Sequence, residues 1–111
     1  MPETRRVVVT GLGAVTPVGN TVAEAWTSLL AGCSGIDRIT LFDTSDFSIK
    51  IGGEVKNFVP EELIPSKELR HMDRSAKFAL VAAKEAVADA QLEIEAECAD
   101  RDGHQARGRI R

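Results

Sequence analysis

Hydrophobic residues follow a clear pattern in three stretches of the chain, and the first of these predicts a strand. Residues 6–10 form a run rich in β-branched side chains that ends at Gly11-Leu12-Gly13. An unbroken apolar run of this kind is typical of a strand covered on both faces, as in a parallel sheet. We therefore expect a strand at 6–10 that pairs with neighbouring strands.

The second stretch predicts a helix that begins after Thr21 and closes at Gly32. Thr21 and Glu24 match a capping box, in which a hydroxyl and a carboxylate three residues later each satisfy a free backbone N–H. Glycine at the end of the stretch permits the left-handed conformation that closes a helix. The apolar residues recur at the spacing of one helix face; they are Val22, Ala25, Trp26, Leu29 and Leu30.

The third stretch predicts a long helix over about 74–91, with Asp73 as its N-cap. Small apolar side chains cover most of its circumference and leave a narrow polar stripe through Lys77, Lys84 and Ala88. Such a helix is expected to be mostly buried inside a larger body. Its apolar positions are Ala76, Ala79, Leu80, Ala82, Ala83, Ala86, Val87 and Ala90.

Weaker signals lie between the two helices. Residues 49–55 alternate around Gly52-Gly53 and predict a short surface strand. Residues 60–63 begin with proline followed by two acids, which favours a short helix, and Pro65 limits it to about one turn.

Composition narrows the class of protein. The chain has 111 residues, 43% of them hydrophobic and only 5% aromatic, so we expect at most one domain with an aliphatic core. No apolar run approaches the roughly 20 residues that span a bilayer, and Cys33 and Cys98 are too few for a disulfide framework. A cytoplasmic protein without membrane contact is expected.

Several motifs, taken in order and at their spacing, resemble the β-ketoacyl-[acyl-carrier-protein] synthases, in particular the type II elongating enzymes. The resemblance covers Arg5 to about Arg101. The motifs are Arg5-Arg6-Val7-Val8-Val9-Thr10-Gly11-Leu12-Gly13-Ala14-Val15-Thr16-Pro17-Val18-Gly19-Asn20, Leu29-Leu30-Ala31-Gly32-Cys33-Ser34-Gly35-Ile36, Phe42-Asp43-Thr44-Ser45, Gly53-Glu54-Val55-Lys56-Asn57-Phe58 and Met72-Asp73-Arg74.

The resemblance implies an α/β fold: the N-terminal part of a thiolase-like domain, a mixed sheet between helical layers, incomplete in this chain. It also implies a homodimer without a cofactor. The implied reaction joins an acyl group, held on a cysteine, to malonyl-acyl carrier protein in fatty acid biosynthesis. The family places that cysteine in a Thr-Ala-Cys-type segment and two histidines further downstream. No catalytic residue is therefore expected in this chain, and the chain alone is expected to be inactive.

The cysteines and histidines present do not form an alternative site. Cys33 follows the C-terminal turn of the first helix, where the helix dipole opposes a thiolate, and Cys98 lies among acidic residues. His71 has no histidine near it in the sequence, and His104 lies in the tail, so no metal site is expected.

A basic segment carries the one candidate binding site. By resemblance, Lys67, Arg70 and His71 match positions at which the family docks acidic acyl carrier protein, where charge would serve orientation and association rate. The alternative interpretation is a solvated basic turn, and the sequence leaves both open.

Gly11-Leu12-Gly13 also resembles the start of a dinucleotide-binding loop. Such a loop opens straight into a helix, whereas Thr16 replaces the third glycine here and Pro17 delays the helix to Val22. A tight exit from the strand is the preferred interpretation.

The last residues depart from the family pattern. Residues 1–100 carry 10 basic and 16 acidic side chains, a net −6, whereas residues 101–111 carry four arginines and one aspartate, a net +3. Residues 1–101 are therefore assigned to a partial ketosynthase domain and 102–111 to a non-cognate, disordered basic tail, as a frameshift would produce. A nucleic-acid patch is disfavoured because the tail lacks aromatic residues.

Two functional hypotheses follow. The first is an N-terminal ketosynthase fragment, inactive and poorly soluble alone because its strand and alanine-rich helix lack neighbours. A fatty-acid enzyme is favoured over a polyketide one, since the chain starts almost at the first motif. The second is a non-catalytic module that binds acyl carrier protein or a subunit, or one part of a split polyketide ketosynthase.

Overall fold

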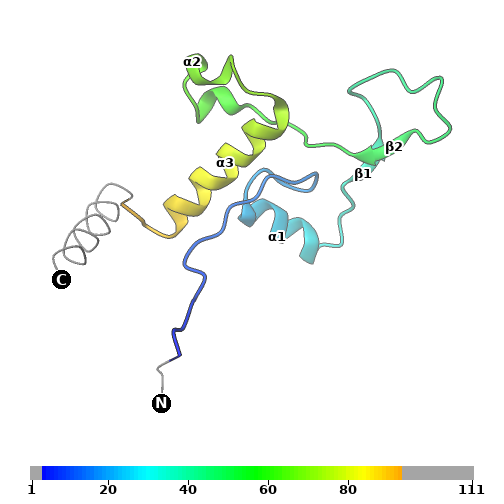
Figure 1. Cartoon of the computed structure of the whole chain (residues 1–111). Coiled ribbons are helices and arrows are strands. Elements are labelled where there is room, and N and C mark those ends of the chain that lie inside the picture. Colours follow the sequence, from blue (N-terminus) through cyan, green and yellow to red (C-terminus); the bar gives the residue numbers. More distant parts are fainter. Residues whose placement is uncertain (1–3, 94–111) are drawn as a thin grey trace.

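A computed structural model describes residues 4–93 (Figure 1). Helix α1 spans Val22–Leu30 and is followed by strands β1 (Ile36–Arg38) and β2 (Ile51–Gly53). A 3-10 turn, η1 (Pro60–Glu62), leads through the short helix α2 (Ser66–Leu69) into the long helix α3 (Arg74–Asp89). The basic tail assigned to 102–111, together with Cys98 and His104, lies outside the described residues.

The prediction of a strand at 6–10 is wrong, because the structure shows no strand at these residues. These residues run away from the helices as an extended segment without strand pairing (Figure 1). Val7, Val8 and Val9 are 93%, 70% and 78% exposed. A strand needs a neighbour for its backbone N–H and C=O groups, and the only sheet within residues 4–93 pairs β1 with β2.

Helix α1 forms as its sequence predicts. The Thr21 hydroxyl accepts from the Glu24 N–H at 3.2 Å, and Gly32 closes the helix at φ +70°. The Cys33 N–H donates to the Ser28 carbonyl at 2.9 Å, which completes a Schellman closure. The capping box is only half formed, because the Glu24 carboxylate accepts from the Asn20 N–H instead of the Thr21 N–H.

Strands β1 and β2 pair antiparallel, with Asp37 opposite Gly52, and carry an arm that projects from the helices (Figure 1). The predicted strand over 49–55 is thus confirmed as a three-residue strand. At the base of the arm the Glu54 carboxylate accepts from the Thr40 and Leu41 N–H groups at 2.8 and 2.9 Å. These bonds, that from Thr40 first, hold the pKa of Glu54 below its ordinary value.

Helix α3 begins where Asp73 caps it, since the Asp73 carboxylate accepts from the Ala76 N–H at 2.8 Å. The helix ends at Asp89, two residues before the predicted end, and Gln91 follows with φ 55°. The helix was expected to be buried on most of its circumference. Within residues 4–93, however, Val81 is its one buried residue. Other layers would have to cover its remaining apolar surface.

A small apolar core lies where η1, α2 and α3 meet. Ile64, Leu69 and Val81 are only 1%, 5% and 5% exposed. The predicted turn of helix at Pro60 is confirmed as η1, whereas α2, which starts directly after Pro65, was not predicted. The half-buried side chains packed against this core are Val15, Phe58 and Leu80.

Candidate functional site

The short helix α2 is fixed to the molecule from both ends. Ile64 lies just before Pro65 and Leu69 ends the helix, and both side chains are buried in the core with Val81 of α3. The Glu68 and Leu69 N–H groups donate to the Pro65 carbonyl at 2.9 and 3.3 Å, which closes the single turn. A four-residue helix has little stability of its own, so its position depends on this packing.

The three candidate docking residues lie on the outer surface of this corner. Lys67, Arg70 and His71 are all exposed, whereas Leu69 between them points into the core. The structure therefore places Lys67 in α2 and Arg70 and His71 in the turn that follows it, at one anchored corner.

Helix α3 adds two basic residues that the sequence did not single out for docking. Arg70 and Lys77 line the same shallow hollow, of about 290 Å³, together with Glu61. The Arg74 guanidinium lies 5.0 Å from the Phe78 ring centroid and donates to the Val55 carbonyl at 3.1 Å. The N-cap at Asp73 was the available signal, because it places 74 and 77 in the first turn, next to α2.

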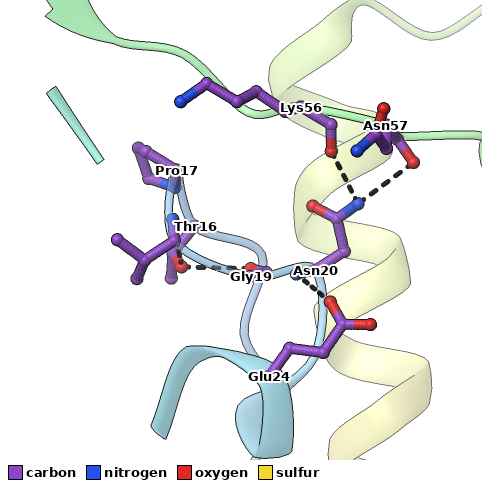
Figure 2. Close-up of a pocket in the computed structure, with 8 residues that line it drawn as sticks. Thr16, Pro17, Gly19, Asn20, Glu24, Lys56 and Asn57 are labelled. Carbon is purple, nitrogen blue, oxygen red and sulfur yellow. Dashed lines mark hydrogen bonds between the residues drawn. The ribbon is translucent and has the colours of Figure 1, made fainter. Parts of the chain in front are cut away.

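A polar hollow near α1 is built around a tight turn (Figure 2). Thr16 and Gly19 exchange backbone hydrogen bonds of 2.8 and 3.2 Å across this turn. The Asn20 side-chain amide donates to the Lys56 and Asn57 carbonyls at 2.8 and 3.1 Å, as the dashed lines in Figure 2 show. The Asn20 amide thus joins two distant segments of the chain and holds the wall of the hollow.

Gly11 and Gly13 pack against α3 and do not form a phosphate cradle. A Cβ atom added to Gly11 would lie 2.7 Å from the Ala90 Cβ, and one on Gly13 would lie 2.8 Å from the Ala86 nitrogen. The two glycines therefore allow a close backbone approach to the alanine-rich helix. The preferred interpretation, a tight exit from a strand, is wrong because 6–10 forms no strand, and the close packing of these glycines on α3 was not predicted.

Two carboxylates of α3 occupy the backbone donors that follow these glycines. Glu85 accepts from the Ala14 N–H at 2.9 Å and from the Val22 N–H at 2.8 Å, and Asp89 accepts from the Leu12 N–H at 3.0 Å. A phosphate would meet negative side chains here, because these donors already bind carboxylates. The same bonds tie the loop of 12–22 to α3 in place of a neighbouring strand.

The remaining candidates lie apart from one another. Cys33 is exposed and lies just beyond the C-terminus of α1, as expected from the sequence. Within residues 4–93 no group of three His, Cys, Asp or Glu side chains is placed to hold a metal ion. No helix in that part of the chain is long and apolar enough to cross a membrane.

Comparison with known proteins defines the class. Residues 4–105 match the family model described as the beta-ketoacyl synthase, N-terminal domain. The chain belongs to this family, and the resemblance drawn from its motifs is confirmed.

Particular relatives sharpen the assignment. The chain is 50% identical over 103 residues to 3-oxoacyl-[acyl-carrier-protein] synthase 2 of Staphylococcus aureus (strain COL), a match that covers 93% of the chain and 25% of the relative. It is 48% identical over 101 residues to the protein of the same name from a Synechocystis species, covering 91% of the chain and 24% of that relative. The chain thus spans about a quarter of the length of these curated relatives.

A solved structure supports the same fold family. The protein titled "The ishigamide ketosynthase/chain length factor" superposes with a TM-score of 0.73 at 39% identity, covering 82% of this chain and 23% of that one. The predicted fold class is therefore confirmed at the level of a ketosynthase-like fold. The described part of this chain shows its helices and one two-stranded sheet.

Proposed function

We propose that this chain forms the N-terminal part of a 3-oxoacyl-[acyl-carrier-protein] synthase, which condenses an acyl group with malonyl-acyl carrier protein in fatty acid biosynthesis. The half-identical relatives of that name support the assignment. The proposal includes the thiolase-like arrangement of the whole domain, a homodimer and a cytoplasmic location. It requires no cofactor.

These 111 residues alone are proposed to be inactive in condensation. The reaction needs a thiolate nucleophile and groups that stabilise the developing enolate and oxyanion. The sequence contains no Thr-Ala-Cys segment, and Cys33 and Cys98 stand in other contexts. The contribution proposed for this part of the enzyme is therefore binding.

The observation that carries the proposal is the exposed basic corner at α2. Lys67 in α2, and Arg70 and His71 in the turn that follows it, are exposed at a corner whose position is fixed by buried Ile64 and Leu69. An anchored cationic surface loses little conformational entropy when it meets an acidic partner, and its charge raises the association rate. We assign this surface to docking of acyl carrier protein.

The test is the affinity of a full-length ketosynthase that carries this sequence as its N-terminal part for a purified acidic acyl carrier protein at several salt concentrations. Arg70→Glu should weaken binding most at low salt, where charges are least screened. Arg38→Glu is the matched control, because Arg38 is also exposed but lies in β1 on the projecting arm. An affinity that Arg70→Glu leaves unchanged and independent of salt would contradict the docking assignment.

A second candidate function is a subunit of a split polyketide ketosynthase. The solved relative titled as a ketosynthase/chain length factor favours it. In that case the chain should co-purify from its own cells with a protein of complementary ketosynthase sequence. Recovery of acyl carrier protein without such a subunit would favour the fatty-acid enzyme.

A further inference from the structure

Two shallow hollows flank the first turns of α3, and Lys77 lines both. The first, of about 290 Å³, also has Arg70 and Glu61 on its wall, and buried Leu69 contributes to its lining. The second, of about 200 Å³, is lined by Arg74, Lys77 and Glu61 with two apolar residues. Lys77, in the first turn of α3, therefore borders α2 and the candidate docking residues.

The basic side chains around these hollows differ in what already holds them. The Arg74 guanidinium is fixed over Phe78 and at the Val55 carbonyl. The Lys84 ammonium donates to the Leu63 carbonyl at 2.9 Å. Arg70 is exposed and Lys77 is half-buried, and both border the hollow over Leu69. These two are the cations best placed to meet an anion from outside.

We propose that Lys77, together with Arg70, forms a second cationic contact of the docking surface and receives a carboxylate of the acidic acyl carrier protein in the hollow over Leu69. This inference rests on the docking function proposed above. A carboxylate seated there would meet two cations from two different elements.

Glu61 opposes the same carboxylate, because it lines both hollows. Its charge repels an incoming anion, so its removal should strengthen docking. The neighbouring Glu62 lines a different hollow, beside Asn20, Leu63 and Val81. The two glutamates thus provide a matched pair with the same change in net charge at adjacent positions.

The first experiment measures binding of the same full-length ketosynthase to purified acyl carrier protein at low ionic strength. Lys77→Gln should weaken binding about threefold, the size expected for one partly screened charge contact. Lys50→Gln, on the arm, should leave the affinity unchanged. The loss in Lys77→Gln with Arg70→Gln should be smaller than the product of the single losses, because both contact one anion. Lys77→Arg should retain binding.

The second experiment compares Glu61→Gln with Glu62→Gln. Glu61→Gln should tighten binding about twofold, whereas Glu62→Gln should change it little, since repulsion falls with distance. A gain in affinity cannot come from local unfolding, so this arm is decisive even if Lys77→Gln disturbs α3. Equal effects of the two variants would overturn the proposed contact.

The outcomes separate this inference from the docking proposal itself. If Arg70→Glu weakens binding but Lys77→Gln and Glu61→Gln do not alter it, the contact at Lys77 is wrong and docking stands. If Arg70→Glu also has no effect, the docking proposal fails. The Lys77→Gln loss should be the same for carrier protein with and without its phosphate-bearing prosthetic arm. A loss seen only with the arm present would show that the anion is the phosphate and would overturn the carboxylate assignment.

Discussion

Gly13 lies directly against Ala82 of α3, so closely that a methyl group on Gly13 would overlap the Ala82 carbonyl oxygen. Gly11 makes the same kind of approach one turn further along, at Ala86 and Ala90. The alanines of α3 and the two glycines thus pack against each other in one continuous contact. Small residues on both sides let the two backbones come close enough to exclude larger side chains.

Gly13→Ala should therefore destabilise the packing of the loop on α3. Overpacking against a backbone costs about 2 kcal/mol, because neither the carbonyl nor the helix can move aside easily. The measurement is the local opening free energy of α3 amides by hydrogen exchange. Gly52→Ala is the control, since its new Cβ would meet only the Ile39 side chain at 3.4 Å. Equal protection in the two variants would contradict the packing role.

Replacing Glu85 should release the loop from α3. Its two carboxylate oxygens accept from the Ala14 and Val22 N–H groups, so Glu85→Ala leaves both part-buried donors without their acceptors. Each lost acceptor costs about 1 kcal/mol or more. Amides near 14 and 22 should exchange faster in Glu85→Ala, and Glu85→Gln should lie between it and the parent chain. Unchanged exchange at both amides would show that solvent replaces the carboxylate without cost.

Gly32→Ala should shorten α1 through backbone strain alone. Gly32 has φ +70°, and a Cβ there would meet no atom within 4 Å. An L-residue in this conformation costs about 1 kcal/mol. Circular dichroism should show reduced helix content, and exchange should quicken at the Cys33 amide. Gly32→Asn should lose less, because asparagine tolerates the left-handed region better.

Acid should loosen the start of α3 through Asp73. The Ala76 N–H, and then the Ser75 hydroxyl, donate to the Asp73 carboxylate and hold its pKa below the ordinary value. A lowered folded-state pKa means that the stabilisation is complete above about pH 4, the unfolded pKa, and is lost as the pH falls through the lower folded value. Helix content from pH 6 to pH 2 should fall more in the parent chain than in Asp73→Asn, which keeps an uncharged cap. Identical pH profiles would rule out a contribution from this carboxylate.

The isolated chain should melt without a sharp cooperative transition. Within residues 4–93 the buried apolar side chains are Ala25, Pro60, Ile64, Leu69 and Val81, whereas Trp26 is 61% exposed. So small a core cannot offset the conformational entropy of the ordered residues. Calorimetry of the purified 111-residue chain provides the measurement. A single sharp transition would contradict this expectation and would require another source of stability.

The two helices were predictable from sequence because their determinants are local. The Thr21 and Asp73 caps, the Gly32 closure and the apolar spacing all act within a few residues. The strand predicted at 6–10 failed for the opposite reason. A run of β-branched residues favours extended backbone, but a strand forms only where another strand pairs with it. The described residues provide no such partner for 6–10.

By itself, the sequence determined the family, the caps and the three candidate docking residues. Only the tertiary structure showed that Gly13 packs on α3, that Glu85 binds amides 71 and 63 positions earlier in the chain, and that Lys77 shares a hollow with Arg70. Sequence motifs and helix caps are determined by residues within one short segment. Contacts between segments depend on how distant parts of the chain pack on α3, and no local pattern specifies that packing.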